Sequence, residues 1–258
     1  MSTFLFDKII FGPVHSRRLG ISLGINLLPV NAKVCTFDCL YCECGFNFKP
    51  KDAHIPSRAE VRAQLHDTLA NMQANGDKLD VITFAGNGEP TIHAEFAGIV
   101  DDTIALRDNF FPSAKISVLS NSTMIHKPEV FAALNKVDNN ILKMDSAIDS
   151  TIKLLNQPNA SSFSRDWLVE HLKRFDGKLI IQTLFLQGEI NNGSIDNTTQ
   201  EEVAAWVDAL KEINPQQVMI YTLDRDTPTK TLRRASHEQL VTIAEKVRNL
   251  GLDVSISD

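Results

Sequence analysis

Segments rich in β-branched residues alternate with amphipathic segments along most of this chain, and this alternation limits the possible folds more than any other feature. We expect strands at residues 21–28, 80–85, 115–120, 140–145, 179–186 and 217–223, each followed by a helical segment. In the first helix, Ser57 and Glu60 are spaced to form a capping box, and Asn75-Gly76 ends the helix. Six strand-then-helix units predict an α/β fold with a parallel sheet and right-handed crossovers.

All four cysteines lie between positions 35 and 44. Cys35, Cys39 and Cys42 are spaced so that one short loop brings three thiolates to a metal centre. A closed structural zinc site takes four ligands, whereas a four-iron cluster held by three cysteines leaves one iron open to a non-protein ligand. Cys44 leaves an alternative open, in which all four thiols hold zinc or a complete cluster, although one residue between Cys42 and Cys44 is tight for two ligands of one ion.

Polar residues gather where the expected strands end. A glycine-rich turn, residues 86–91, follows the strand at 80–85, and Ser120-Asn121 ends the strand at 115–120. Lys143 and Asp145 end the next strand and face the same side, because side chains alternate along a strand. Ordinary turns and a satisfied salt bridge would account for these residues more simply. Active sites of α/β barrels lie at this end of the strands, however, and the polar segment 187–199 is placed to cover a substrate there.

The cysteine spacing resembles the signature of the radical S-adenosylmethionine (SAM) superfamily, Cys-x3-Cys-x-aromatic-Cys, with Cys35, Cys39, Tyr41 and Cys42 at the matching positions. The resemblance implies a partial (β/α)6, TIM-like barrel formed by a single domain over residues 1–258. Residues 1–20 would be an N-terminal extension and residues 29–50 the cluster-binding loop. It also implies a 4Fe–4S cluster whose open iron binds SAM, reductive cleavage to a 5′-deoxyadenosyl radical, and hydrogen abstraction from an unidentified substrate. An electron donor such as flavodoxin or ferredoxin would be needed.

The same resemblance assigns further cofactor-binding residues. Asn87-Gly88-Glu89-Pro90 is similar to the Gly-Gly-Glu-Pro motif whose backbone binds the SAM amino group, with Asn in place of the first glycine. Asn tolerates tight turns better than most residues. Tyr41 would pack on the adenine. The remaining candidates are polar residues at strand ends, Ser120 and Asn121 for the SAM ribose or carboxylate and Lys143 and Asp145 for the carboxylate or the substrate.

A closer resemblance covers residues 11–26, which are similar to a group of uncharacterised radical SAM oxidoreductases related to the enzymes that build the wybutosine base of tRNA. Characterised wybutosine enzymes carry additional N-terminal cysteines for a second cluster, and this chain has no cysteine before Cys35. That difference counts against the same reaction. Arg17 and Arg18 lie in this segment and are suited to bind a phosphate or carboxylate.

Charge and hydropathy narrow the classes of partner. The formal net charge of −6 does not favour nucleic acid as a partner, so an RNA substrate is open but not favoured, beside a protein side chain or small metabolite. No run of about 18 apolar residues is present, which predicts no membrane span. Asp7 and Lys8 interrupt the apolar N-terminus, so we expect no signal peptide. Thiols reserved for metal indicate a cytoplasmic protein. The alternative from another class is a non-catalytic zinc-binding module.

Overall fold

An eight-stranded sheet organises the chain. The computed structural model describes residues 4–16, 18–190 and 193–258. The sheet contains β1 (Ile10–Ser16), β2 (Gly20–Ile25), β3 (Val81–Phe84), β4 (Lys115–Ser120), β5 (Asn139–Lys143), β6 (Ile180–Leu184), β9 (Gln217–Tyr221) and β11 (Val254–Ser257), in the order β1-β2-β3-β4-β5-β6-β9-β11. Every neighbouring pair from β2 to β11 is parallel. β1 is antiparallel to β2.

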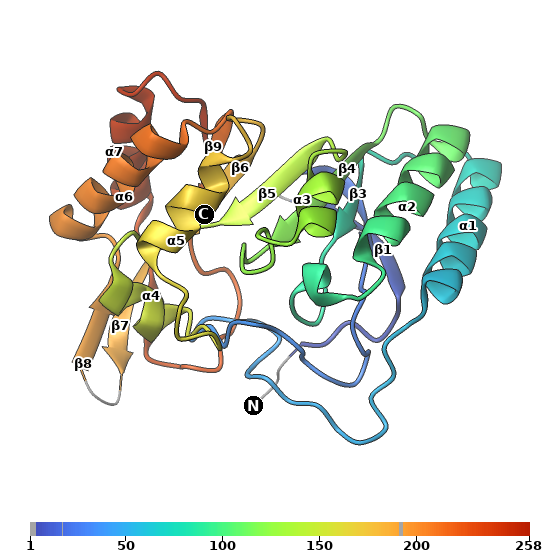
Figure 1. Cartoon of the computed structure of the whole chain (residues 1–258), viewed down its shortest axis with the longest axis horizontal. Helices are drawn as coiled ribbons and strands as arrows, with labels where there is room; N and C mark the ends of the chain where they lie inside the picture. The colour runs from blue at the N-terminus through green and yellow to red at the C-terminus, as the bar shows by residue number, and fades with distance from the viewer. Residues whose placement is uncertain (1–3, 17, 191–192) are drawn as a thin grey trace.

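The sheet is open, with β1 and β11 at its two edges. The predicted partial barrel is therefore confirmed, and its strands curve across the molecule from one group of helices to the other (Figure 1). Part of the expected N-terminal extension belongs to the sheet, because β1 forms a hairpin with β2. The long segment between β2 and the first helix, which carries the cysteines, runs below both halves of the sheet in this view.

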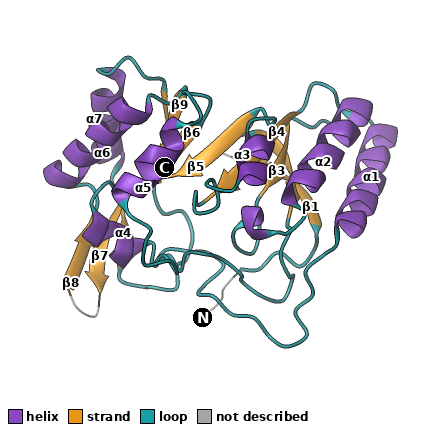
Figure 2. Cartoon of the chain, viewed as in Figure 1, coloured by secondary structure: helices purple, strands orange, loops and turns teal. Residues whose placement is uncertain are grey.

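Seven α-helices cover the outer face of the sheet within the described residues (Figure 2). They are α1 (Arg58–Asn75), α2 (Phe96–Phe110), α3 (Pro128–Leu134), α4 (Asp149–Leu155), α5 (Arg165–Lys173), α6 (Gln200–Ile213) and α7 (His237–Arg248). A short 3-10 helix, η1 (Pro90–Ile92), follows β3. The predicted capping box of α1 is confirmed, because Ser57 and Glu60 bond each other's backbone, and Gly76 ends the helix at φ 72°. Within the described residues, no helix is long and apolar enough to cross a membrane.

Two hydrophobic clusters divide the core. The larger one joins the helices to the outer face of the sheet. A small second cluster consists of Ile141, Ile180 and Met219 from three neighbouring strands, with Leu19 and Leu119 packed against it. Side chains alternate between the faces of a strand, so Ile141 faces the side opposite to Leu142, which belongs to the larger cluster. The small cluster thus fills part of the concave side of the sheet, and Leu19 comes from the β1–β2 turn.

The segment at 187–199 differs from the expected loop. β7 (Leu186–Ile190), β8 (Gly193–Asp196) and β10 (Leu232–Arg234) form a separate antiparallel sheet in the order β10-β7-β8. Leu186 and Gly188 are buried while Gln187 and Glu189 are not, which is the alternation of a half-buried strand. Glycine at position 188 lets the Thr231 backbone approach closely, because a Cβ there would lie 2.7 Å from the Thr231 carbonyl oxygen. Asn191 and Asn192 of this segment lie outside the described residues.

Candidate active site

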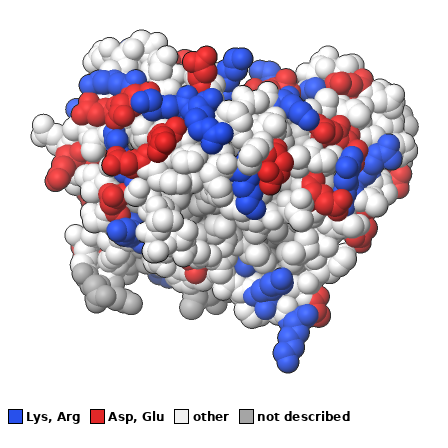
Figure 3. Space-filling view, in the orientation of Figure 1, with Lys and Arg blue, Asp and Glu red and all other residues white. Residues whose placement is uncertain are grey.

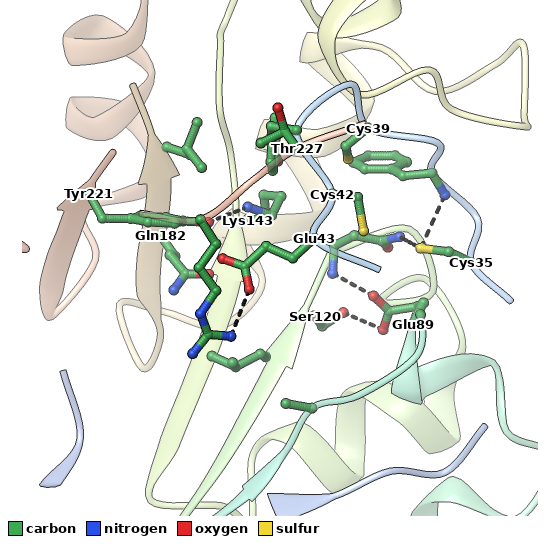
Figure 4. A pocket seen from close by; sticks show the side chains of 18 of the residues that line it. Cys35, Cys39, Cys42, Glu43, Glu89, Ser120, Lys143, Gln182, Tyr221 and Thr227 are labelled. Atoms are coloured by element: carbon green, nitrogen blue, oxygen red, sulfur yellow. Dashed lines mark hydrogen bonds and ion pairs between the residues drawn. The ribbon is translucent and has the colours of Figure 1, made fainter. Parts of the chain in front are cut away.

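A cavity of about 290 Å³ opens where the cysteine loop meets the carboxyl ends of the parallel strands (Figure 4). All but two of the predicted site residues line it, namely Cys35, Cys39, Tyr41, Cys42, Gly88, Glu89, Ser120, Asn121 and Lys143. The exceptions are Asn87 and Asp145, of which Asp145 bonds the lining residues Tyr41 and Lys143. Residues from separate segments of the sequence therefore meet at one place.

A buried ion pair holds the cysteine loop in shape. Lys33 Nζ lies 2.9 Å from Asp38 Oδ1 and 3.3 Å from the Phe37 carbonyl oxygen. Asp38 Oδ1 also accepts the Asn47 backbone N–H at 2.7 Å, and Asn47 Oδ1 accepts the Cys35 backbone N–H at 2.9 Å. Lys33 is only 3% exposed and lines the cavity. Burial alone would lower the pKa of Lys33, yet Cys42 and Asp38 hold that pKa above its ordinary value.

The glycine-rich turn packs directly on the cysteine loop. The Val34 N–H donates to the Asn87 carbonyl at 2.9 Å, and the Glu89 N–H donates to the Val34 carbonyl at 3.2 Å. Gly88 has a φ of 138°, and a Cβ there would lie 1.8 Å from the Val34 carbonyl oxygen. Only glycine satisfies both conditions. The Asn87 amide bonds Phe6 and Pro29 instead of pointing into the cavity, so its side chain anchors the turn to the N-terminal segment.

Glu89 connects this turn to the end of β4. Its Oε1 accepts the Thr91 N–H at 3.1 Å, the Thr91 hydroxyl and the Ser120 hydroxyl at 2.9 Å. Its Oε2 accepts the Asn121 N–H at 2.6 Å. The Asn121 side chain then donates to Cys35 Sγ at 3.4 Å. Burial raises the pKa of Glu89 against the lowering effect of these donors. The Glu89 carboxylate therefore fixes the strand end that contacts the first cysteine.

A second network lies behind Tyr41. The Tyr41 hydroxyl donates to Asp145 Oδ2, which also accepts Asn156 Nδ2 at 2.7 Å. Lys143 Nζ lies 3.4 Å from Asp145 Oδ1 and 5.2 Å from the centre of the Tyr41 ring. Lys143 and Asp145 thus form the salt bridge that their spacing allows, and only Lys143 lines the cavity. Burial, followed by the Asp145 charge, raises the pKa of Tyr41 well above its usual value and keeps it a hydrogen-bond donor.

The thiols have environments suited to a metal. Burial raises the pKa of Cys35 to about 12 and that of Cys39 to about 11. A bound cation removes this penalty, because it stabilises the thiolate form. A hydrogen bond from the Cys44 thiol lowers the pKa of Cys42 to about 6 against the effect of burial. The Cys44 sulfur lies 3.6 Å from the Gly86 carbonyl oxygen, and Cys44 does not line the cavity.

This donor set fits a four-iron cluster better than a single ion. Among the described residues, no three His, Cys, Asp or Glu side chains converge closely enough to hold one metal ion. A four-iron cluster instead takes one thiolate on each iron that the protein binds, so the thiols need not converge on one ion. Cys35, Cys39 and Cys42 line one cavity, and in Figure 4 they lie together on one side of it. Cys44 does not line this cavity, so the three cysteines of the signature, and not all four, face the same space.

Sequence reasoning did not assign several residues of the cavity. Tyr221, Gln182 and Arg225 line it, and Arg225 Nη1 pairs with Glu43 Oε2 at 3.0 Å. Gln182 lies on β6 and Tyr221 ends β9, and the carboxyl ends of these strands share one edge of the sheet with those of β3, β4 and β5. That shared edge is the signal that could have identified both residues. Arg18 also lines the cavity, and Arg17 lies outside the described residues.

No protein-family model matches the chain. A UPF0026 protein of Methanocaldococcus jannaschii is 30% identical over 241 residues, which are 91% of this chain and 70% of that protein. A protein of Brachyspira hyodysenteriae named GTPase Obg is also 30% identical over 241 residues, and the match covers 92% of this chain but only 33% of that protein. The shared region is thus one part of the longer Brachyspira protein.

Solved structures with the same fold are radical SAM enzymes. A radical SAM methyltransferase from Sphaerobacter thermophilus superposes with a TM-score of 0.65 at 13% identity, covering 92% of this chain and 65% of that one. Streptococcus suis SuiB bound to S-adenosylmethionine gives 0.63 at 15% identity, covering 88% and 49%. TYW1 with a lysine-pyruvate adduct gives 0.58 at 9% identity, covering 90% and 74%. The chain has the radical SAM fold and belongs to the UPF0026 protein family.

Proposed function

We propose that this protein is a radical SAM enzyme in which Cys35, Cys39 and Cys42 hold a 4Fe–4S cluster. The observation that carries the proposal is that these three thiols and the glycine-rich turn line one cavity at the carboxyl ends of the strands. When bound there, the reduced cluster supplies the electron that cleaves SAM to methionine and a 5′-deoxyadenosyl radical, which takes a hydrogen atom from the substrate. The neighbours with this fold, including one with SAM bound, support the assignment.

In this proposal the chain's own residues bind and orient SAM. The backbone between Asn87 and Glu89 accepts the SAM amino group, while the Glu89 carboxylate keeps that backbone against β4. The Tyr41 ring packs on the adenine, and its hydroxyl bond to Asp145 sets the ring orientation. Ser120, Asn121 and Lys143 are the polar groups on the cavity wall that would meet the ribose and carboxylate.

The electron would come from a separate reduced protein such as a flavodoxin or ferredoxin. The cysteine loop is the natural approach, because Phe46 and Phe48 of this loop are 43% and 64% exposed and Lys49 and Lys51 follow them. Lysines beside exposed apolar side chains suit an acidic donor protein.

A tRNA base is the second candidate substrate, because residues 11–26 resemble a group related to the enzymes that build the wybutosine base of tRNA. The charges near the cavity do not strengthen the case for an RNA substrate. Arg225 pairs with Glu43, and Lys230 pairs with Asp226 at 2.8 Å. On the face in Figure 3, basic and acidic side chains are interspersed and form no continuous basic stripe. We therefore place the protein among radical SAM enzymes without assigning it to RNA modification.

A pair of cysteine variants tests the ligand assignment. Cys39→Ala removes a proposed ligand, and Cys44→Ala removes a nearby thiol that lies off the cavity wall. After anaerobic reconstitution with iron and sulfide, Cys39→Ala is expected to retain little iron and to cleave no SAM. Cys44→Ala removes a hydrogen bond to Cys42 but no proposed ligand, so it is expected to retain iron like the unmodified protein and to cleave SAM. Equal iron content in all three proteins, with SAM cleavage by Cys39→Ala, would sink the assignment.

A further inference from the structure

The β1–β2 turn brings a cation to the cavity from the end of the sheet opposite to the cysteines. Ser16 and Gly20 pair across this hairpin, and Ser16 Oγ accepts the backbone N–H groups of Arg18 and Leu19 at 3.3 and 3.2 Å. Leu19 packs on the small cluster of Ile141, Ile180 and Met219 on the concave side of the sheet. Leu19 therefore lies inside the half-barrel, and Arg18 lines the same cavity as the cysteines.

The aromatic ring of Tyr221 fixes the guanidinium of Arg18. The Arg18 Cζ atom lies 4.6 Å from the ring centre. The Tyr221 hydroxyl accepts Lys143 Nζ at 3.0 Å, so the ring itself is held in place (Figure 4). A guanidinium stacked on a ring face keeps its N–H groups free at its edge, where they match a carboxylate or phosphate in a planar fork.

Arg18 differs from the other cations that line the cavity. Lys33 pairs with Asp38, Lys143 with Asp145, and Arg225 with Glu43. Arg18 Nη1, in contrast, is buried with no hydrogen-bond partner among the described residues. Within the same part of the chain, Arg18 also makes no ion pair with a carboxylate. A buried N–H without a partner is costly, and the cost disappears if a ligand in the cavity supplies the acceptor.

The carboxylates on the cavity wall are engaged elsewhere. Glu43 pairs with Arg225, and Glu89 accepts hydrogen bonds from three residues. Asp224 has an interaction of its own. In Figure 4, Tyr221 and Gln182 lie on the side of the cavity away from the three cysteines. The unsatisfied guanidinium group thus belongs to the part of the cavity remote from the proposed cluster.

We propose that Arg18 binds an anionic group of the substrate, a carboxylate or a phosphate, at the end of the cavity remote from the cysteines. This inference rests on the proposed function, since it assigns the remaining space of the SAM site to the substrate. Stacking on Tyr221 pre-orients the guanidinium, and the substrate anion satisfies its buried N–H. The site selects for substrates that carry a negative charge at a distance from the hydrogen atom to be removed.

Anion binding to the whole reconstituted chain tests the proposal without requiring turnover. Inorganic phosphate and acetate are titrated separately at constant ionic strength, in the presence of SAM, and binding is followed by the melting temperature and by line broadening of the anion's NMR signal. At least one anion is expected to bind saturably. The anion that binds more tightly identifies the substrate group as a phosphate or a carboxylate. Arg18→Gln is expected to weaken that binding roughly tenfold, because a charge-assisted bond is lost.

Matched variants show whether the anion binds at Arg18 or at another basic group of the surface. Arg233→Gln removes an exposed arginine of β10 and is expected to leave anion binding unchanged. Arg18→Lys keeps the charge without the planar fork, so its affinity should lie between those of Arg18→Gln and the unmodified protein. Circular dichroism and the melting temperature without anion report whether each variant is folded. If Arg18→Gln is not folded, the anion affinity of Arg18→Lys is compared with that of Arg233→Gln, and only the Arg18 variant should bind more weakly than the unmodified protein.

Three results would overturn the proposal. They are no saturable binding of either anion, equal anion affinity in the Arg18 variants and the unmodified protein, and an Arg18→Gln protein whose SAM affinity falls as far as its anion affinity. The last result would assign Arg18 to the SAM carboxylate. Failure of the proposed function looks different: the unmodified protein would bind the anion through Arg18 but release no 5′-deoxyadenosine.

Discussion

Asn121 Nδ2 lies 3.4 Å from Cys35 Sγ, although 86 positions separate the two residues in sequence. The contact exists because Glu89 Oε2 accepts the Asn121 backbone N–H at 2.6 Å and so holds the end of β4 beside the cysteine loop. Hydrogen bonds to ligand sulfurs tune the reduction potential of iron–sulfur clusters. Asn121 is therefore placed to act on the proposed cluster through Cys35.

Replacing Asn121 is expected to lower the reduction potential of the cluster. Asn121→Ala removes an N–H donor that favours the reduced, more negative cluster, so the potential should become more negative by tens of millivolts with the iron content unchanged. A redox titration followed by electron paramagnetic resonance measures the shift. Asn159→Ala is the control, because the Asn159 amide donates to the Cys35 carbonyl oxygen at 3.2 Å and not to the sulfur. Equal potentials in the two variants would contradict the role of Asn121.

Two glycines with positive φ are expected to respond differently to a methyl group. Gly76 ends α1 at φ 72° with no atom near its would-be Cβ, so Gly76→Ala should cost about 1 kcal/mol of unfolding free energy. Gly88→Ala forces the backbone away from Val34 and should cost about 3 kcal/mol or more. It should also reduce iron retention, since Val34 precedes Cys35. Chemical denaturation and iron analysis measure both effects, and similar costs at the two positions would argue against the close packing of the turn.

The Lys143–Asp145 pair gives a prediction about stability. Asp145→Asn leaves the buried Lys143 ammonium without its carboxylate and is expected to cost about 3 kcal/mol of unfolding free energy. Asp226→Asn breaks an exposed pair with Lys230 and should leave the unfolding free energy unchanged. Denaturation of both variants in parallel measures the contrast. An Asp145→Asn protein as stable as the unmodified one would mean that Lys143 finds another partner.

Asp102 is expected to contribute to acid sensitivity. The Arg58 guanidinium bonds it at 2.7 and 2.9 Å and holds the pKa of Asp102 below its ordinary value of 3.8. A carboxylate with a lowered pKa contributes stability that is present above about pH 4 and is lost as the pH falls through the folded-state pKa. Asp102→Asn should therefore lower the melting temperature slightly at neutral pH and reduce its further fall in acid.

The neighbouring pair provides the control for this measurement. Asp101 Oδ1 lies 2.7 Å from Lys136 Nζ, and both side chains are about half exposed. Asp101→Asn is expected to leave the pH profile of the melting temperature close to that of the unmodified protein. Identical profiles for the Asp101 and Asp102 variants would contradict a special contribution from the Arg58 contact.

The sheet, the first helix and the cysteine loop could be predicted from the sequence, because their signals are local. Periodicity and the Ser57–Glu60 spacing placed α1, and polar residues after β3, β4 and β5 marked the edge that forms the cavity. The small sheet of β7, β8 and β10 was missed, since β7 pairs on one side with β10, a segment more than forty residues away.

Residues that support the site could not be predicted, because their roles depend on distant partners. Asn156 ends α4, an ordinary place for Asn, yet its amide reaches Cys39 Sγ at 3.5 Å and Asp145 at 2.7 Å. Lysine is usually exposed, yet Lys33 is buried and pairs with Asp38. The partners of Asn87 and Glu89 likewise come from segments that only the folded chain brings together.

The most direct test of the central claim is anaerobic reconstitution of the unmodified protein, followed by reduction and addition of SAM. Iron per chain and 5′-deoxyadenosine are measured on the same sample. The account predicts about four irons per chain and release of 5′-deoxyadenosine that requires both SAM and reductant. One tightly bound zinc, with no visible absorption and no SAM cleavage, would contradict it and would make the cysteine loop structural.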